Sequence, residues 1–257
     1  MLDYDEEAER YDALRGGEPR AAAAADAVLG LLPAGTRRVL DLACGTGIVT
    51  RRLAAHGLDV TGVDLAEGMV RHAAARLPGA VVRADCRRLP FPDGVFDAVT
   101  SVWLLHLLPD PADARAVVAE CARVLRPGGV YVTTVDKAAA HNVGSDIDAV
   151  LASRPRTPAT DAAATVGAYA AEHRLVPAGQ GRFTGHGQGR SPRRTVADLR
   201  RGWFVTLPPG SPLAEGFAGR LAALPDQDRP RADPVFSLRA FRRPAVPVPA
   251  PGPAAAG

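Results

Sequence analysis

Lysine is almost missing from this sequence of 257 residues, and aromatic residues are scarce. Lys137 is the only lysine, although lysine and arginine together number 31, and the formal net charge is a modest +3. Aromatic residues make up 5% of the chain, and few of them interleave with the arginines that cluster between Arg182 and Arg201. Because a single-stranded nucleic acid needs aromatic side chains on which its bases stack, the composition predicts no nucleic-acid partner.

Long apolar runs and clustered cysteines are also missing. No run of 18 or more apolar residues occurs, so we expect no membrane span. The sequence opens with acidic residues rather than with a basic segment and an apolar core, so we expect no signal peptide. Cys44, Cys86 and Cys121 are scattered without metal-ligand spacing, which predicts no metal site and three reduced, buried thiols. Together these features predict a cytoplasmic protein.

The segment 38–52 is the part of the chain around which the rest is organised. Residues 39–42 form an apolar run broken only by Asp41, as in a buried parallel strand, and residues 44–47 read Cys-Gly-Thr-Gly. Apolar residues then recur at helical spacing from Ile48. A strand, a glycine turn and a helix in succession are typical of a nucleotide site, because glycines allow a sharp turn and let a ligand approach the backbone.

The spacing of this turn separates it from other glycine loops. A P-loop needs Gly-Lys-Ser/Thr at the start of the helix, and the segment has no lysine. A dinucleotide fingerprint needs a third glycine where Thr50 stands. Asp41 instead places a carboxylate beside the turn, which suits a ligand with a positive charge. We therefore favour a nucleoside joined to an amino acid, and the alternative is a glycine turn in some other α/β protein.

A second acid ends the next predicted strand. Residues 58–63 are mostly apolar and lead into Asp64, which follows Asp41 by 23 positions. An acid about 20 residues after the turn can bond ribose hydroxyls, and each hydrogen bond to a charged group is worth about 1.5–3 kcal/mol. The alternative is that Asp64 only caps the following helix. Because Asp64 occurs together with the glycine turn, we favour a role in binding the ligand.

Seven segments between residues 11 and 135 share one wider pattern, at 39–47, 62–64, 84–86, 89–91, 96–99, 105–110 and 123–129. With this pattern the chain resembles the class I S-adenosylmethionine-dependent methyltransferases that act on small molecules. The resemblance implies an α/β fold with a Rossmann-like, seven-stranded, mostly parallel sheet, helices on both faces and an antiparallel last strand. It implies S-adenosyl-L-methionine as the cofactor. Ala43 departs from the pattern, since many members have glycine there.

The resemblance also assigns cofactor contacts. They fall on Tyr11, Arg15, Asp41, Ala43, Gly45, Gly47, Asp64, Leu65, Asp85, Cys86 and Ser101. Asp41 and the glycine turn would hold the methionine part, and Asp64 the ribose. Asp85 would accept a hydrogen bond from the adenine amino group while the Cys86 N–H meets the ring, which is a complementary pair. For Asp85, as for Asp64, a simple helix cap is the alternative.

The first 35 residues are expected to form a lid and a helix. Such a leading segment often folds over the cofactor in this family, which is why Tyr11 and Arg15 are candidates there. The alternative is a solvated amphipathic helix that packs on the core.

His106 is the candidate general base. It follows the fourth predicted strand by a few residues, where relatives often place a histidine that faces the acceptor. An imidazole with a pKa of about 6.5 can take a proton from an oxygen or nitrogen nucleophile at neutral pH. The alternative is a histidine packed among the neighbouring leucines. Candidate acceptor contacts are Trp103, Asp136, His141 and Tyr169, of which Trp103 suits the core equally well.

We expect one domain over residues 1–243, with a substrate-side insertion at 137–181. The sixth strand is placed around 181–184. Residues 235–241 alternate in polarity and suit the seventh strand, an antiparallel hairpin partner at the sheet edge. Residues 244–257 are rich in proline and alanine, which predicts a disordered tail.

The predicted function is methyl transfer to a small-molecule acceptor, in secondary metabolism. One alternative is a methyltransferase fold that catalyses cyclisation or elimination, or that serves as a partner subunit in a biosynthetic pathway. A less favoured one is a nucleic-acid methyltransferase. Enzymes of that kind that methylate amino groups carry Asn/Asp-Pro-Pro-Tyr/Phe where residues 101–104 read Ser-Val-Trp-Leu. The sequence is compatible with a homodimer and with a complex with a pathway partner.

Overall fold

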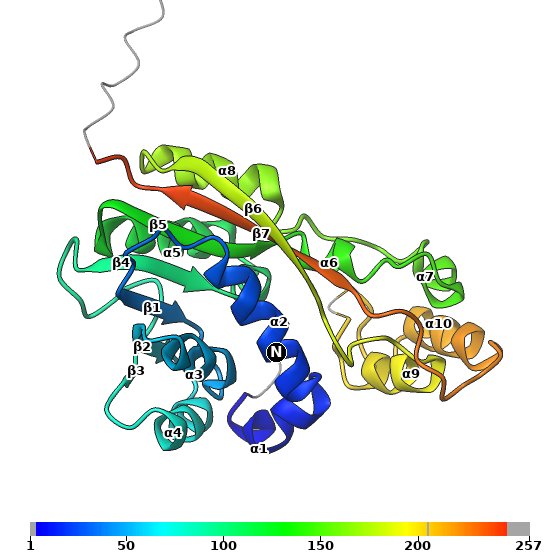
Figure 1. Cartoon of the computed structure of the whole chain (residues 1–257). Coiled ribbons are helices and arrows are strands. Elements are labelled where there is room, and N and C mark those ends of the chain that lie inside the picture. Colours follow the sequence, from blue (N-terminus) through cyan, green and yellow to red (C-terminus); the bar gives the residue numbers. More distant parts are fainter. Residues whose placement is uncertain (1–3, 205, 246–257) are drawn as a thin grey trace, which may run out of the picture.

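The structure, a computed structural model, describes residues 4–204 and 206–245. A seven-stranded sheet forms its centre, in the strand order β3-β2-β1-β4-β5-β7-β6 (Figure 1). The strands are β1 (Arg38–Leu42), β2 (Asp59–Asp64), β3 (Val81–Arg83), β4 (Phe96–Ser101), β5 (Leu125–Val135), β6 (Val176–Thr184) and β7 (Val235–Arg242). Within the described ranges, β7 runs in the opposite direction to the other six strands. The predicted Rossmann-like, mostly parallel sheet is confirmed.

Helices surround this sheet. They are α1 (Tyr4–Leu14), α2 (Gly17–Leu29), α3 (Ile48–Ala55), α4 (Glu67–Arg76), α5 (Pro111–Val124), α6 (Lys137–Ala140), α7 (Asp146–Leu151), α8 (Ala163–Glu172), α9 (Pro192–Arg200), α10 (Pro212–Ala222) and a single 3-10 turn at Leu105–Leu107. In the part of the chain that the structure covers, none of them is long and apolar enough to cross a bilayer.

Two hydrophobic cores lie on the two faces of the sheet. Because side chains alternate along a strand, Leu40 and Leu42 of β1 pack with α5 and α8, whereas Val39 packs with α2 and α3. Phe236 and Leu238 of β7 extend the core beneath α2. Both faces are therefore covered by helices, as the sequence predicts.

The position of the seventh strand differs from the prediction. β7 was placed at the sheet edge, but it pairs with β5 on one side and β6 on the other, so the edge belongs to β6. The sequence located only the end of β6, at 181–184, because most of this strand is exposed and carries no apolar alternation. An exposed strand lacks the buried face that makes a strand visible in a sequence.

A smaller lobe stands beside the sheet (right in Figure 1). It consists of α7, α9 and α10 around a core of its own, with Ile147, Leu151, Leu199 and Phe217 among its buried side chains. The segment 137–181, predicted as one insertion, is divided in space. It gives α7 to the lobe, but α8 packs on α5 against the sheet. Most of the predicted tail, residues 246–257, lies outside the described residues.

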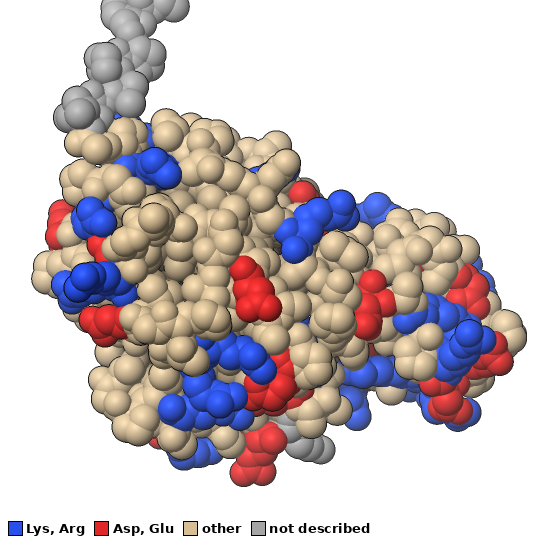
Figure 2. Space-filling model, in the orientation of Figure 1, with Lys and Arg blue, Asp and Glu red and all other residues tan. Residues whose placement is uncertain are grey.

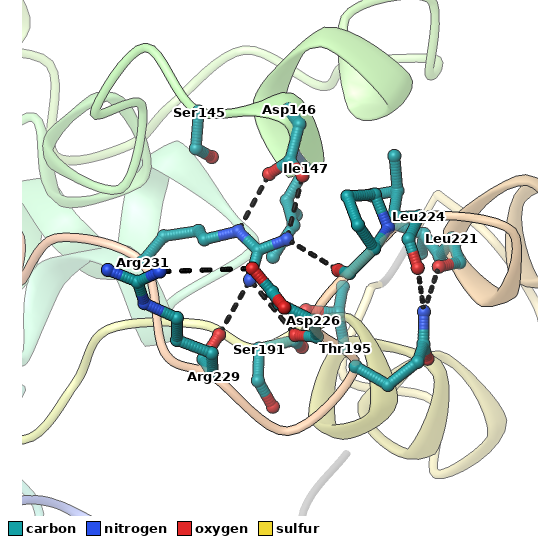
Figure 3. Close-up of polar contacts among 12 residues, drawn as sticks. Ser145, Asp146, Ile147, Ser191, Thr195, Leu221, Leu224, Asp226, Arg229 and Arg231 are labelled. Carbon is teal, nitrogen blue, oxygen red and sulfur yellow. Dashed lines mark hydrogen bonds and ion pairs between the residues drawn. The ribbon is translucent and has the colours of Figure 1, made fainter.

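Arg231, in the segment that leads into β7, ties this lobe together (Figure 3). Its guanidinium donates to both carboxylate oxygens of Asp146 at the start of α7, at 2.8 and 2.7 Å. It also donates to the backbone oxygens of Pro225, Asp226 and Arg229. A two-pronged bond between guanidinium and carboxylate fixes orientation as well as distance. The loop after α10 is thereby held against α7.

Candidate active site

The carboxyl ends of the parallel strands bring the three predicted acids to one edge of the sheet. Asp41 lies opposite Gly62 of β2 and Thr100 of β4, and Asp64 is the last residue of β2. Burial raises the pKa of the Cys86 thiol to about 12, and the charges of Asp64, Asp85 and Asp41 add to that effect. Because β1, β2 and β3 are neighbouring parallel strands, the three carboxylates follow the same edge of the sheet, where open α/β sheets bind their ligands.

The glycine turn after β1 presents bare backbone. Ala43, Gly45 and Gly47 have positive φ values of 51°, 57° and 76°. A Cβ on Gly45 would meet nothing nearer than the Met69 Sδ at 4.0 Å, so this side of the turn is open. A Cβ on Gly47 would lie 3.1 Å from Ala73 of α4, so that glycine serves close packing instead. The left-handed conformation costs an alanine about 1–2 kcal/mol relative to glycine at position 43.

Asp64 both locks the turn and precedes the next helix. Its Oδ2 accepts the N–H of Gly45 at 2.8 Å, and its Oδ1 accepts the N–H of Ala66 at 3.0 Å. Burial raises the pKa of Asp64, while these backbone bonds lower it. Because Ala66 is the N-cap of α4, Asp64 orders the chain just before that helix and does not cap it. Its carboxylate keeps a lone pair for a further donor. Leu65 beside it is 58% exposed, which is unusual for a large apolar side chain.

The Asp41 side chain is almost fully enclosed by the protein. It is 3% exposed, and its two oxygens accept hydrogen bonds from the hydroxyls of Thr50 at 2.6 Å and Thr100 at 2.7 Å. Burial raises its pKa to about 6, although the two hydroxyls lower it. The sequence analysis missed this pair of threonines, which link β1 to α3 and β4.

Asp85 is paired with a neighbour that the sequence analysis did not consider. Arg87 Nε lies 3.0 Å from both carboxylate oxygens and Arg87 Nη2 lies 2.7 Å from Oδ2. This bond lowers the pKa of Asp85. The guanidinium also reaches Asp113 of α5 at 2.9 Å. Asp85 is partly exposed, so its remaining lone pairs face solvent.

Two predicted contacts point into the protein. The Ser101 hydroxyl is fully buried and bonds the hydroxyls of Tyr131 at 2.7 Å and Thr133 at 2.8 Å. Its side chain thus joins β4 to β5, so at the end of β4 only the backbone of Ser101 can meet a ligand. Tyr169 is buried in the core under α5 and α8, with the Arg115 guanidinium 5.2 Å from its ring.

His106 lies against the only lysine in the chain. The single 3-10 turn after β4 carries His106, and Lys137 begins α6 directly after β5. Lys137 Nζ donates to His106 Nε2 at 2.7 Å, and the buried Nδ1 has no partner. Burial lowers the pKa of His106 well below its usual value, and nearby Lys137 lowers it further. The imidazole is therefore neutral. When Lys137 carries its charge it can only donate, and the hydrogen of the imidazole then lies on Nδ1.

Lys137 itself is the clearest residue that the sequence analysis passed over. Burial lowers its pKa to about 7, and the neighbouring arginines add to the effect. The sequence contains a sign that Lys137 is functional, because it is the one lysine among 31 basic residues and it directly follows a predicted strand. Asp136, a predicted acceptor contact, adopts φ 54° and accepts the N–H of Ala163, so it fixes the turn that carries Lys137.

Trp103 lies at the end of β4 between the core and the site. Its ring contacts Phe183 and Phe236 edge to face, at centroid distances of 5.5 and 5.6 Å. The Arg20 guanidinium of α2 lies 4.1 Å above the same ring. The His141 ring also packs on Phe236, with the ring centroids 5.6 Å apart. Trp103 is thus a core residue on one side and supports a cation on the other.

The first helix contacts the glycine turn. The Thr46 hydroxyl donates to Asp12 of α1 at 2.7 Å, and Arg76 of α4 donates to the same carboxylate at 2.6 Å and to the Thr46 backbone oxygen at 2.7 Å. The guanidinium of Arg15, at the end of α1, stacks 3.8 Å from the ring of Trp203. Asp12 therefore links α1 to the glycine turn and to α4, while the ligand contacts predicted for Tyr11 and Arg15 remain predictions.

Comparisons with known proteins agree with this geometry. Residues 40–133 match the family model described as a methyltransferase domain. The demethylmenaquinone methyltransferase of Beutenbergia cavernae is 48% identical over 97 residues, which cover 37% of this chain and 39% of that protein. The ubiquinone biosynthesis O-methyltransferase of Xanthomonas oryzae pv. oryzae is 38% identical over 152 residues, 55% of this chain and 53% of that protein. The chain therefore matches 39–53% of the length of these two relatives.

A solved structure matches nearly the whole chain. The crystal structure of the cyclase SpnF superposes with a TM-score of 0.61 at 21% identity, over 95% of this chain and 94% of that one. At this identity the likeness establishes the fold alone. Over residues 40–133 the chain is thus similar to a methyltransferase domain, and the sheet order and the glycine turn agree with that likeness.

Proposed function

We propose that this protein transfers the methyl group of S-adenosyl-L-methionine to a nucleophilic atom of a small-molecule acceptor. The observation that carries the proposal is the open backbone at Gly45, held by the carboxylate of Asp64 beside the exposed Leu65. When bound, the cofactor supplies an electrophilic methyl carbon. The protein then has to align the acceptor and remove its proton.

The residues at the strand ends suit the three parts of this cofactor. The free lone pairs of Asp64 are placed to accept from ribose hydroxyls, and Leu65 offers an apolar surface to the adenine. Asp85 and the Cys86 N–H remain our assignment for the adenine edge. The buried charge of Asp41 favours the ammonium of the methionine part, since each carboxylate oxygen accepts only one protein donor.

We assign proton removal to His106. Its Nε2 lone pair, which here accepts the Lys137 hydrogen bond, is the atom that would receive the proton. The imidazole is neutral over the physiological range because burial lowers its pKa. A positioned base of this kind contributes about 10²–10⁴ in rate.

The surroundings favour a small acceptor in a biosynthetic pathway such as secondary metabolism. The two curated relatives are named for small-molecule acceptors. On the face shown in Figure 2, acidic and basic side chains lie next to one another rather than forming a basic surface for nucleic acid. We further propose that residues 1–243 act as one domain, in which α1 is a lid and the lobe of α7, α9 and α10 forms a wall of the acceptor site.

Incubation with methyl-labelled cofactor and a panel of small acceptors tests the proposal. Label in the product, lost in a Gly45→Val variant whose backbone surface is covered, is the expected result. Conversion of an acceptor without label would instead identify a cyclase or eliminase. Failure to bind the cofactor at millimolar concentration would contradict the proposal itself.

A further inference from the structure

Four cationic side chains from four separate elements converge beyond the carboxyl ends of β4 and β5. They are Arg15 after α1, Arg20 in α2, Lys137 at the start of α6 and Arg190 before α9, and we call them the cation cluster. The charges of the three arginines all act on Lys137 and lower its pKa, so the four groups share one region. A hydrogen bond from Gln188 to the Arg15 backbone oxygen, at 3.2 Å, joins the two loops that carry Arg15 and Arg190.

Within residues 4–204 and 206–245, the cluster is held by contacts with aromatic rings and by a hydrogen bond rather than by ion pairs. None of its four members takes part in an ion pair among the described residues. Arg15 and Arg20 instead stack on Trp203 and Trp103, and the Arg190 guanidinium lies 5.5 Å from the Phe204 ring. Arg20 is 4% exposed, and its buried Nε has no hydrogen-bond partner.

Three carboxylates near the cluster have hydrogen-bond or ion-pair partners elsewhere. Asp161 accepts the backbone N–H of Lys137 at 2.9 Å, and Asp12 is ion-paired with Arg76. Asp148 accepts from Ser145 and Val143 at the start of α7. Asp198 lies within electrostatic range of Arg15 and Arg190, but burial raises its pKa and disfavours its charge.

A buried cation without an opposite charge is costly. Arg20 is the buried member of the cluster and is hydrogen-bonded to Tyr11, whereas Arg15, Lys137 and Arg190 are half-buried and accessible to a ligand that brings the opposite charge. Beside Arg190 lies a small cavity of about 10 Å³, the size of one water molecule, bounded by His141, Gln188, Arg190 and Asp148. Planar guanidinium groups match the geometry of carboxylate and phosphate oxygens.

We propose that the cation cluster binds an oxyanion carried by the methyl acceptor, a carboxylate or a phosphate. The inference rests on the proposed function, because it places the acceptor at the ends of β4 and β5. An oxyanion in this position pairs with the Lys137 ammonium and draws it from His106, which frees the imidazole Nε2 for the acceptor proton. The acidic group of the substrate would thus complete the catalytic site.

Calorimetric titration of the full chain, saturated with S-adenosylhomocysteine, tests this inference. The probes are benzoate, phenyl phosphate and the neutral benzamide, at constant ionic strength. The variants are Arg190→Gln and Lys137→Met, with Arg190→Lys and Lys137→Arg as forms that keep the charge. Arg182→Gln is the matched control, because Arg182 is exposed on the edge strand β6.

We expect benzoate or phenyl phosphate to bind at least tenfold more tightly than benzamide. The tighter of the two identifies the acceptor group as carboxylate or phosphate. Removing the charge of Arg190 or Lys137 should weaken that binding at least tenfold, the charge-keeping forms should restore most of it, and Arg182→Gln should leave it within twofold. Equal binding of benzamide, or unchanged oxyanion binding in both neutral variants, would overturn the inference.

The cofactor's own carboxylate is the competing occupant, and the same titration separates the two. If the ligand-free protein binds benzoate but S-adenosylhomocysteine displaces it, the cluster serves the cofactor and the inference is wrong. S-adenosylhomocysteine binding is measured in every variant. Normal binding of it without oxyanion binding overturns this inference alone, whereas its absence from the wild-type protein counts against the proposed function.

Discussion

Replacing Asp41 by asparagine should make the ligand-free protein more stable at neutral pH. Burial raises the pKa of Asp41 from 3.8 to about 6, so the folded state holds a proton that the unfolded state releases. Below about pH 4 the group is protonated in both states and costs nothing. As the pH rises through 6 the folded state must bear a buried charge, and two pKa units correspond to about 3 kcal/mol.

An asparagine at this position avoids that charge and keeps the surrounding hydrogen bonds. Its carbonyl accepts from Thr50, and its amide donates to the hydroxyl of Thr100, which can turn its own hydrogen to the Leu40 backbone oxygen at 3.5 Å. The stability of Asp41→Asn relative to wild type should therefore be about 2.5 kcal/mol greater at pH 8 than at pH 4, where the unfolded state is already partly ionised. Asp59→Asn, an exposed change on the neighbouring strand, should move stability by less than about 0.5 kcal/mol.

Urea unfolding at pH 4, 6 and 8, with and without S-adenosylhomocysteine, measures this difference. The ligand should remove most of the advantage of Asp41→Asn at pH 8, because its ammonium would compensate the carboxylate only in the wild-type protein. A relative stability that does not change with pH would refute the argument about burial. If the ligand left the stability difference between Asp41→Asn and wild type at pH 8 unchanged, Asp41 would not be the residue that pairs with the ligand's ammonium.

Three further predictions concern the turn and the base. Ala43→Gly should raise stability by about 1 kcal/mol in urea unfolding, since glycine accepts φ 51° without strain, and a loss of stability would contradict this. Asp64→Asn should weaken S-adenosylhomocysteine binding about 10- to 100-fold in calorimetry, by loss of charged hydrogen bonds, and affinity within threefold of wild type would refute its role. His106→Gln, which can still accept from Lys137, should lower kcat at least about 100-fold with KM little changed, and a change in KM alone would make His106 a binding residue.

The strands that carry the glycine turn could be predicted from the sequence because their signals are local. The apolar run at β1, the turn after it and the acid at the end of β2 lie within 27 residues, from Arg38 to Asp64. Parallel strands buried on both faces give continuous apolar runs, and this determined the fold class. The order of β6 and β7 could not be obtained in this way, because a sequence shows which strands exist but not which of them pair.

The hydrogen-bond partners of the predicted acids could not be predicted from the sequence for a related physical reason. Asp41 finds Thr50 in α3 and Thr100 in β4, which only the fold brings together. The Asp12 contact with Thr46 depends in the same way on how α1 docks. Lys137 differs from these, because its rarity and its place after a strand were visible, and only its contact with His106 needed the structure.

The account depends most directly on whether the edge formed by β1, β2 and the glycine turn binds S-adenosyl-L-methionine. Calorimetric titration of the full chain with this ligand, beside Gly45→Val and Asp64→Asn, is the most direct test. The account predicts one site per chain for the wild-type protein, no binding when a side chain covers the turn, and weakened binding without the carboxylate. No heat of binding at millimolar ligand, or equal affinity in all three proteins, would contradict it.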